Sequence, residues 1–453
     1  MGRDLRICKQ DKIKKIFRFK TGKAIIIKFV EVMIQGKFAK DMILGKLGMN
    51  HSVKLINHNG KDMKQGSIVV NQRENYSSRQ KHKKSSGQEV QQSHQDPCLQ
   101  EHSLLDNYLK GNKLQDKTER SRGEKSAADA TKPCESRESQ IQNDPPSLNY
   151  RNCRLCPKCC GVNREAGEPG ACGMGAELRV ARASLHMWEE PSLSGEHGSG
   201  TVFFSGCPLS CVYCQNHAIS SGKLGEKLSA QDLVDVFLKL QALGAENINL
   251  VTACHFLPQV REALIAAKAK GLILPVVYNS SGYERVESLR ELEGLIDIYL
   301  PDFRYWDNQL ALRYSQAPHY VETTQDALAE MFRQVGPFIL DQRGMMQKGM
   351  IVRQLLLPGQ TEAAMAISHD LHKRYGDAIM LSLMSQYTPL HKNALRAFPE
   401  LQKKVDPAEY ERWVDFCVDE EIVNAYVQEG EAASESFIPD FTSWKLADFL
   451  GKN

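Results

Sequence analysis

Short apolar runs alternate with amphipathic runs through the second half of the chain, and this alternation predicts repeated strand–helix units. Six continuous apolar runs predict buried strands, at residues 201–205, 248–251, 275–278, 296–300, 350–356 and 378–383. Apolar positions three and four apart predict helices between them, at 231–243, 257–270, 284–292, about 309–335 and 362–374. Continuous apolar strands separated by helices require a parallel sheet covered by helices. The pattern therefore predicts an α/β fold, as an open or closed barrel.

The segments before this pattern differ from it in composition. Residues 1–50 carry thirteen Lys and Arg against four acids, and 75–148 hold only eight Val, Ile, Leu, Met, Phe or Trp among seventy-four residues. So little apolar surface does not offset the entropy of ordering a chain. We therefore divide the chain into a basic, low-complexity and largely disordered extension (1–148), a Cys-rich segment (149–198) and a β/α barrel (199–445).

Charge and hydropathy exclude some classes of protein. The formal net charge is only +3, which argues against a nucleic-acid-binding surface. The best apolar stretch, residues 24–34, is interrupted by Lys28 and Glu31, so no membrane span is expected. Eight of the thirteen cysteines lie between positions 153 and 214, which indicates metal or iron–sulfur chemistry in a reducing compartment. We expect a cytoplasmic protein, with import into an organelle left open.

Three cysteines follow the first predicted strand at the spacing C-x3-C-x2-C: Cys207, Cys211 and Cys214. Three thiolates on one tight loop can each ligate one iron of a cubane cluster and leave the fourth iron open. The alternative is a closed zinc site with His217 as fourth ligand. A position just after a strand favours a reactive centre, because active sites of β/α barrels lie at the carboxyl ends of the strands.

The sequence motifs around this triad resemble those of the radical S-adenosylmethionine (radical SAM) superfamily. Six short motifs make the resemblance more specific, to the pyruvate formate-lyase-activating-enzyme-like branch of that superfamily. They are 198–200 (GSG), 203–207 (FFSGC), 214–216 (CQN), 247–252 (NINLVT), 277–279 (VYN) and 385–387 (SQY). The resemblance covers about residues 150–440. It implies a partial (β/α)6 TIM-like barrel of the radical SAM type, with the Cys-rich segment and the disordered extension before it.

The resemblance also implies cofactors and site residues. Cys207, Cys211 and Cys214 would hold a [4Fe-4S] cluster, and its open iron would bind S-adenosylmethionine. Asn279, Asp302 with Arg304, and Arg353 stand at or after later strands, where related activases contact the cofactor. Tyr213 would pack near the adenine or in the core.

Two positions depart from the superfamily or its branch. His255 stands where many members carry Gly-Gly-Glu, and it could donate a proton, contact the cofactor or be structural. Gln354 stands where the branch tends to have His.

A second set of cysteines precedes the barrel: Cys153, Cys156, Cys160 and Cys172. Four thiolates within twenty residues, separated by Gly and Pro, indicate a zinc site or a second iron–sulfur cluster, with Cys159 as an extra. Glu189 and Glu190 precede Pro191, and they could lie in the barrel cavity, but the interpretation we favour is a surface turn.

Two classes of function remain from the sequence. The first is an enzyme that cleaves S-adenosylmethionine to a 5′-deoxyadenosyl radical and abstracts hydrogen, either from a partner protein as a glycyl-radical activase does or from a small molecule. It would need a one-electron donor such as flavodoxin or ferredoxin. The second is a non-catalytic iron–sulfur or zinc protein on a barrel scaffold. The position of the triad and the strand-end polar residues favour the enzyme.

Overall fold

The computed structural model describes residues 148–390, 393–428 and 439–451. All of them belong to one compact unit, His94–Asn453. The extension predicted over 1–148 lies outside the described residues except for its last residue. In the described ranges no helix is long and apolar enough to cross a membrane.

In the part of the chain that the structure describes, seven parallel strands form the centre of the sheet: the six that the sequence analysis predicts and β10 as a seventh. In spatial order they are β10 (Ala425–Val427), β9 (Met380–Met384), β8 (Met346–Leu355), β6 (Ile298–Pro301), β5 (Val276–Ser280), β4 (Ile248–Val251) and β2 (Ser199–Phe204). Antiparallel β1 (Arg179–His186) and β3 (Glu226–Lys227) extend the β2 edge, and β7 (Ile339–Leu340) pairs with β8. β10 and β3 are the two ends of this strand order, so the structure confirms a partial, TIM-like barrel.

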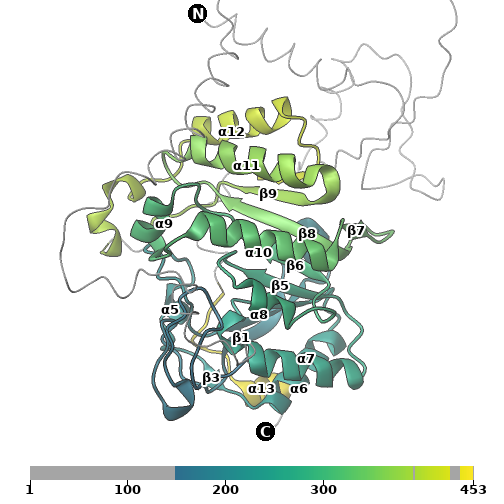
Figure 1. Cartoon of the computed structure of the whole chain (residues 1–453). Coiled ribbons are helices and arrows are strands. Elements are labelled where there is room, and N and C mark those ends of the chain that lie inside the picture. Colours follow the sequence, from purple (N-terminus) through teal and green to yellow (C-terminus); the bar gives the residue numbers. More distant parts are fainter. Residues whose placement is uncertain (1–147, 391–392, 429–438, 452–453) are drawn as a thin grey trace, which may run out of the picture. The chain divides into compact units, whose positions relative to one another are not determined.

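Helices follow the strands and cover one face of the sheet. The longer ones are α6 (Ala230–Ala242), α7 (Leu257–Ala269), α9 (Asn308–Ser315), α10 (Tyr320–Val335), α11 (Thr361–Tyr375) and α12 (Pro407–Asp419). Short helices are α4 (Pro191–Ser194), α5 (His217–Ser220), α8 (Val286–Arg290) and α13 (Leu446–Leu450). In Figure 1, some of these helices lie one after another along the sheet. From top to bottom of the picture they are α11, α10, α8 and α7.

The helix predicted over 309–335 is wrong in one respect, because it is two helices. α9 ends at Ser315, and the linker contains Gln316 and His319 with φ of 53° and 55°. Pro318 lies between them and cannot donate a helical hydrogen bond. Elsewhere the predicted helices lie close to the observed ones. α6 begins where Ser229 and Asp232 form a reciprocal capping box.

The interior of the barrel is apolar where it meets the segment between β1 and β2. Leu193 of α4 is fully buried and packs in one cluster with Val277, Ile298, Leu300, Met346, Ile351 and Met380. β1 ends at His186, which pairs with Ser199 at the start of β2. Residues 187–198 therefore lie at the amino-terminal end of the parallel strands. We call this segment the floor loop.

We predict that Leu193→Ala lowers the free energy of unfolding by about 3 kcal/mol, because it leaves a cavity in a closely packed cluster. Urea unfolding measured by circular dichroism checks this. The matched control is Leu243→Ala, since Leu243 ends α6 with its side chain exposed. Equal losses for the two variants would contradict the role of Leu193 as a buried plug.

Candidate active site

The Cys triad lies on the loop between β2 and α5, at the carboxyl end of the parallel strands. Gly206 introduces this loop with φ of 84°, and a Cβ there would come within 2.4 Å of Met174 Cγ and 2.8 Å of the Cys172 carbonyl oxygen. Only glycine fits so close an approach. The Cys207 backbone N–H donates to the Cys172 carbonyl at 3.3 Å. The tight turn thus packs the triad loop against the upstream Cys segment.

The three thiols are held near one another. Burial raises the pKa of Cys207 well above its usual range, and the neighbouring Cys211 and Cys214 raise it further. Burial and Cys211 likewise raise the pKa of Cys214 to about 11. A positive centre among these sulfurs would relieve this penalty by favouring the thiolates. The donor set therefore fits a cationic iron–sulfur cluster, whereas His217, the alternative zinc ligand, is exposed.

Asn279, Asp302 and Arg353 come together in the barrel interior from three neighbouring strands. The Arg353 guanidinium donates to Asp302 Oδ1 at 2.8 Å and to Asn279 Oδ1 at 2.6 Å. Burial alone would raise the pKa of Asp302, but the Arg353 and Arg304 guanidiniums outweigh it and hold the pKa below its usual range. Asp302 is therefore a buried carboxylate between two guanidiniums.

Arg304 connects this group to the triad. Its guanidinium donates to Asp302 Oδ2, and its Nη1 lies 3.3 Å from Cys211 Sγ. The Ser315 hydroxyl also donates to Cys211 Sγ, at 2.9 Å. A continuous chain of contacts therefore runs from Asn279 through Arg353, Asp302 and Arg304 to a triad sulfur.

The interpretation of Glu189 and Glu190 as a surface turn is wrong. The Glu189 carboxylate lies 3.4 Å from Arg353 Nη1 and accepts from Asn249 Nδ2 at 3.1 Å. Glu190 is 8 % exposed. The floor loop carries both acids into the interior, where Arg353 attracts them. Sequence reasoning missed them because a Glu pair before Pro, next to the exposed Trp188, is typical of a surface turn.

The upstream Cys segment is fastened to the barrel by Arg164, which is 1 % exposed. Its guanidinium donates to the His255 carbonyl at 2.7 Å and to the Gly175 carbonyl, and it stacks 4.3 Å from the Tyr150 ring. Cys153 Sγ lies 3.7 Å from the same guanidinium. The Cys-rich segment is thus held by a buried cation as well as by apolar contacts.

The predicted second metal site is not supported by this geometry. Gly170 packs against both Cys160 Sγ and Cys172 Sγ, since a Cβ there would lie 3.6 and 3.3 Å from them. Yet among the residues described, no three Cys, His, Asp or Glu side chains converge on one position for a metal ion. This is true of the upstream cysteines and of the triad alike. The cysteine side chains of either set would therefore change their rotamers when a metal ion or cluster binds.

His255 has a structural role in this arrangement. Its Nε2 lies 2.7 Å from the Ser205 carbonyl oxygen, two residues before Cys207. A carbonyl can only accept, so Nε2 carries the hydrogen and Nδ1 does not. Burial lowers the pKa of His255 to about 3, against a smaller opposing effect of this hydrogen bond. The ring is therefore neutral at physiological pH and orients the start of the triad loop.

Two further predicted positions face the core. Gln354 donates to Ser368 Oγ on α11 at 3.1 Å, so it points to the helical layer while its neighbour Arg353 points inward. Tyr213 is 6 % exposed, and its hydroxyl lies 2.5 Å from that of Tyr305. The structure places Tyr213 in the core beside the triad.

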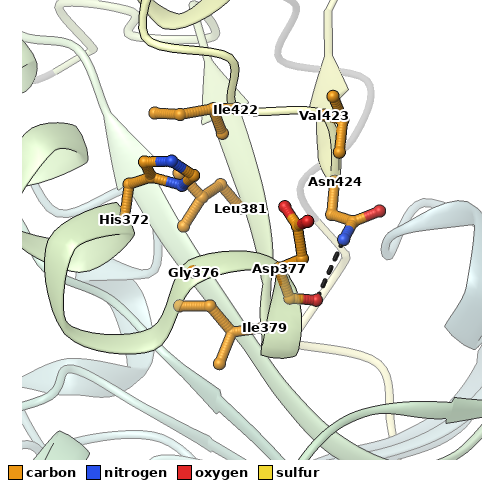
Figure 2. Close-up of a pocket in the computed structure, with 8 residues that line it drawn as sticks. All are labelled: His372, Gly376, Asp377, Ile379, Leu381, Ile422, Val423 and Asn424. Atoms are coloured by element: carbon orange, nitrogen blue, oxygen red, sulfur yellow. Dashed lines mark hydrogen bonds between the residues drawn. The ribbon is translucent and has the colours of Figure 1, made fainter. Parts of the chain in front are cut away.

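A small, shallow hollow lies at the other end of the strands (Figure 2). Its wall includes His372 of α11, Asp377, and Asn424 just before β10. The Asn424 amide donates to the Asp377 carbonyl at 3.0 Å. The hollow opens beside the amino-terminal ends of β9 and β10, whereas the triad follows the carboxyl end of β2. It is therefore separate from the candidate active site.

Part of the barrel is similar in sequence to a known family of enzymes. Residues 201–342 match the model of the Radical SAM superfamily. The match includes the triad, Asn279 and Asp302, and it ends before Arg353. It supports assigning this part of the barrel to that superfamily.

Individual relatives are more distant. An uncharacterized protein of Methanocaldococcus jannaschii, MJ0674, is 26 % identical over 275 residues, which are 59 % of this chain and 75 % of the relative. Similar solved structures include Streptococcus suis SuiB bound to S-adenosylmethionine (12 % identity, TM-score 0.35, 49 % of this chain and 48 % of that one). Another is the FeFe-hydrogenase maturase HydG of Carboxydothermus hydrogenoformans (14 %, TM-score 0.36, 54 % of each chain). The chain spans about half the length of these structures.

We predict that His255→Asn weakens the dependence of stability on acid. In the wild type, His255 stays neutral when folded but takes up a proton when unfolded, so unfolding becomes easier as the pH falls below 6.5 toward 3. His255 thereby lowers the free energy of unfolding by up to about 1.4 kcal/mol for each unit that the pH falls in this range. Urea unfolding at several pH values between 7 and 5 measures it. His217→Asn is the exposed control and should keep the wild-type slope; a wild-type slope in His255→Asn would contradict the prediction.

Proposed function

We propose that this protein is a radical SAM enzyme that holds a [4Fe-4S] cluster on Cys207, Cys211 and Cys214 and cleaves S-adenosylmethionine reductively. The observation that carries the proposal is the position of the triad. It lies after the first parallel strand of the barrel, within the segment that matches the superfamily, and joins the strand-end polar group through Arg304. The loaded cluster would supply one electron that breaks the cofactor into methionine and a 5′-deoxyadenosyl radical.

The chain's own residues would bind and orient the cofactor. The guanidinium of Arg353 and the amide of Asn279 offer fixed hydrogen-bonding groups that Asp302 and Arg304 connect to the triad, and Asp302 holds Arg353 in place. A guanidinium matches a carboxylate in a planar, two-point contact, so the cofactor's carboxylate is the group we assign to Arg353. The buried interior would also keep water from a reactive carbon radical.

The reaction we favour is hydrogen abstraction in the manner of the glycyl-radical activases. The sequence motifs of that branch support this, with flavodoxin or ferredoxin as the electron donor in a reducing compartment. A small molecule is the second candidate for the substrate. The formation of a protein-borne radical in a co-expressed partner, detected by electron paramagnetic resonance, distinguishes the two.

We expect Cys207→Ala, Cys211→Ala and Cys214→Ala each to lose the bound cluster and to reduce 5′-deoxyadenosine formation to background. The reason is that three thiolates are needed to hold three irons. Iron and sulfide analysis after anaerobic reconstitution, followed by product chromatography with dithionite as reductant, checks both effects. Cys417→Ala is the control, because Cys417 is a buried free thiol on α12. Full activity in any triad variant would refute the proposal.

A bound metal at Cys153, Cys156, Cys160 and Cys172 remains a separate proposal. Cys160 and Cys172 face the same glycine, and the Cys160 thiol lies 3.9 Å from the Cys153 carbonyl oxygen, to which it donates. We expect the triple Ala variant of the triad to retain about one zinc ion or a residual cluster per chain. Elemental analysis of that variant tests whether the upstream cysteines bind metal. A metal-free protein would mean that these four cysteines are free thiols.

A further inference from the structure

Among the described residues, several buried polar atoms have no hydrogen-bond partner, and two of them are acceptor oxygens of a carboxyl and an amide group. They are Oε2 of Glu190 and Oδ1 of Asn249, on side chains that are 8 % and 0 % exposed. A buried acceptor without a donor costs free energy, and most such groups in native proteins are paired. Both atoms belong to residues outside the cofactor-binding group assigned above. They therefore indicate a partner that the chain does not itself provide.

Glu189 links the two residues to each other and to Arg353, because Asn249 and Arg353 contact its carboxylate and Glu190 follows it in the chain. Asn249 is the second residue of β4, level with Thr201 of β2 and Val277 of β5, and its amide already donates to Glu189. Glu190 precedes α4 and contacts the Ser382 hydroxyl of β9, the strand beside Arg353. The floor loop thus presents two adjacent carboxylates to the interior from below, and β4 adds an amide oxygen.

The charges in this region balance only while Glu190 is protonated. Glu189, Glu190 and Asp302 carry three carboxyl groups against the two guanidiniums of Arg304 and Arg353. Arg304 contacts Asp302 and Cys211, and Arg353 contacts Asp302, Asn279 and Glu189. Burial accordingly raises the pKa of Glu190 to about 7, more than Arg353 lowers it. A cation beside Glu190 would favour its carboxylate form and pair with the additional negative charge.

We propose that Glu190 and Asn249 form a recognition site for an ammonium or guanidinium group of the substrate. This inference rests on the proposed function, because it places the substrate in the same interior as the cofactor. A cation with several N–H donors pairs with both free acceptors and balances the carboxylate form of Glu190. An anionic group would meet two carboxylates instead. The substrate is thus an amine or guanidine, either as a small molecule or as a Lys or Arg side chain of a peptide.

The test measures binding of simple cations to the full-length, anaerobically reconstituted protein with saturating S-adenosylmethionine. Ethylamine and agmatine represent small molecules, and the capped amino acids N-acetyl-lysine amide and N-acetyl-arginine amide represent peptides. Acetamide is the neutral comparison. Saturation-transfer NMR gives the dissociation constants. We expect at least one cation to bind, acetamide not to bind, and Glu190→Gln to weaken the cation at least about tenfold.

Two further variants complete the design. Glu196→Gln makes the same chemical change at an exposed position of the floor loop and should bind like the wild type. Asn249→Leu removes the second acceptor and should also weaken binding, which covers the case that Glu190→Gln does not fold. Equal binding to wild type and folded variants, or no binding of any cation to the wild type, overturns the inference.

Measuring the affinity for S-adenosylmethionine distinguishes a role of Glu190 in substrate recognition from a role in cofactor binding. A loss of S-adenosylmethionine affinity in Glu190→Gln, with no effect on cation binding, would assign the acids to the cofactor and also overturn the inference. Formation of 5′-deoxyadenosine by the wild type is measured in parallel. If it occurs while no cation binds, only the inference fails; if it does not occur, the proposed function fails.

Discussion

The arrangement of the barrel interior depends on one buried cation, the guanidinium of Arg353. It contacts Asp302 after β6, Asn279 on β5 and Glu189 of the floor loop, so one side chain on β8 joins four parts of the chain. Burying such a charge costs several kcal/mol unless opposite charges and hydrogen bonds compensate it. The surrounding acids and amides meet that requirement, and in doing so they bring polar chemistry into an otherwise apolar barrel.

A second buried cation has the same role outside the sheet. Arg164 fastens the Cys-rich segment to the loop after β4, while His255 of that loop donates to the end of β2. The Cys172 carbonyl then accepts from Cys207. Through these contacts the segment before the barrel supports the triad loop from behind. The two sets of cysteines are therefore neighbours in space, although β1 and β2 separate them in sequence.

Local chemistry explains which features were predictable from the sequence. The runs that form β4 and β5 are continuous apolar segments, and Ser229 with Asp232 marks the start of α6, so these elements follow from short-range patterns. The positions of the triad and of Asp302 follow from the strand-end rule. Glu189 does not, since it meets Arg353 across 164 positions of sequence and its own loop has no periodicity. Pro318 marks the break between α9 and α10, which the helical pattern on both sides does not indicate.

The floor loop and the triad loop are the two ends of a single strand. β2 has six residues, Ser199–Phe204, and at about 3.3 Å per residue it is roughly 20 Å long. It pairs with β1 on one side and β4 on the other, which fixes its register. The strand therefore acts as a spacer of fixed length between the interior acids and the cysteines. In evolutionary terms, a one-residue insertion or deletion within β2 would turn its side chains to the opposite face and displace one of the two loops, whereas the loops themselves can vary in length without that penalty.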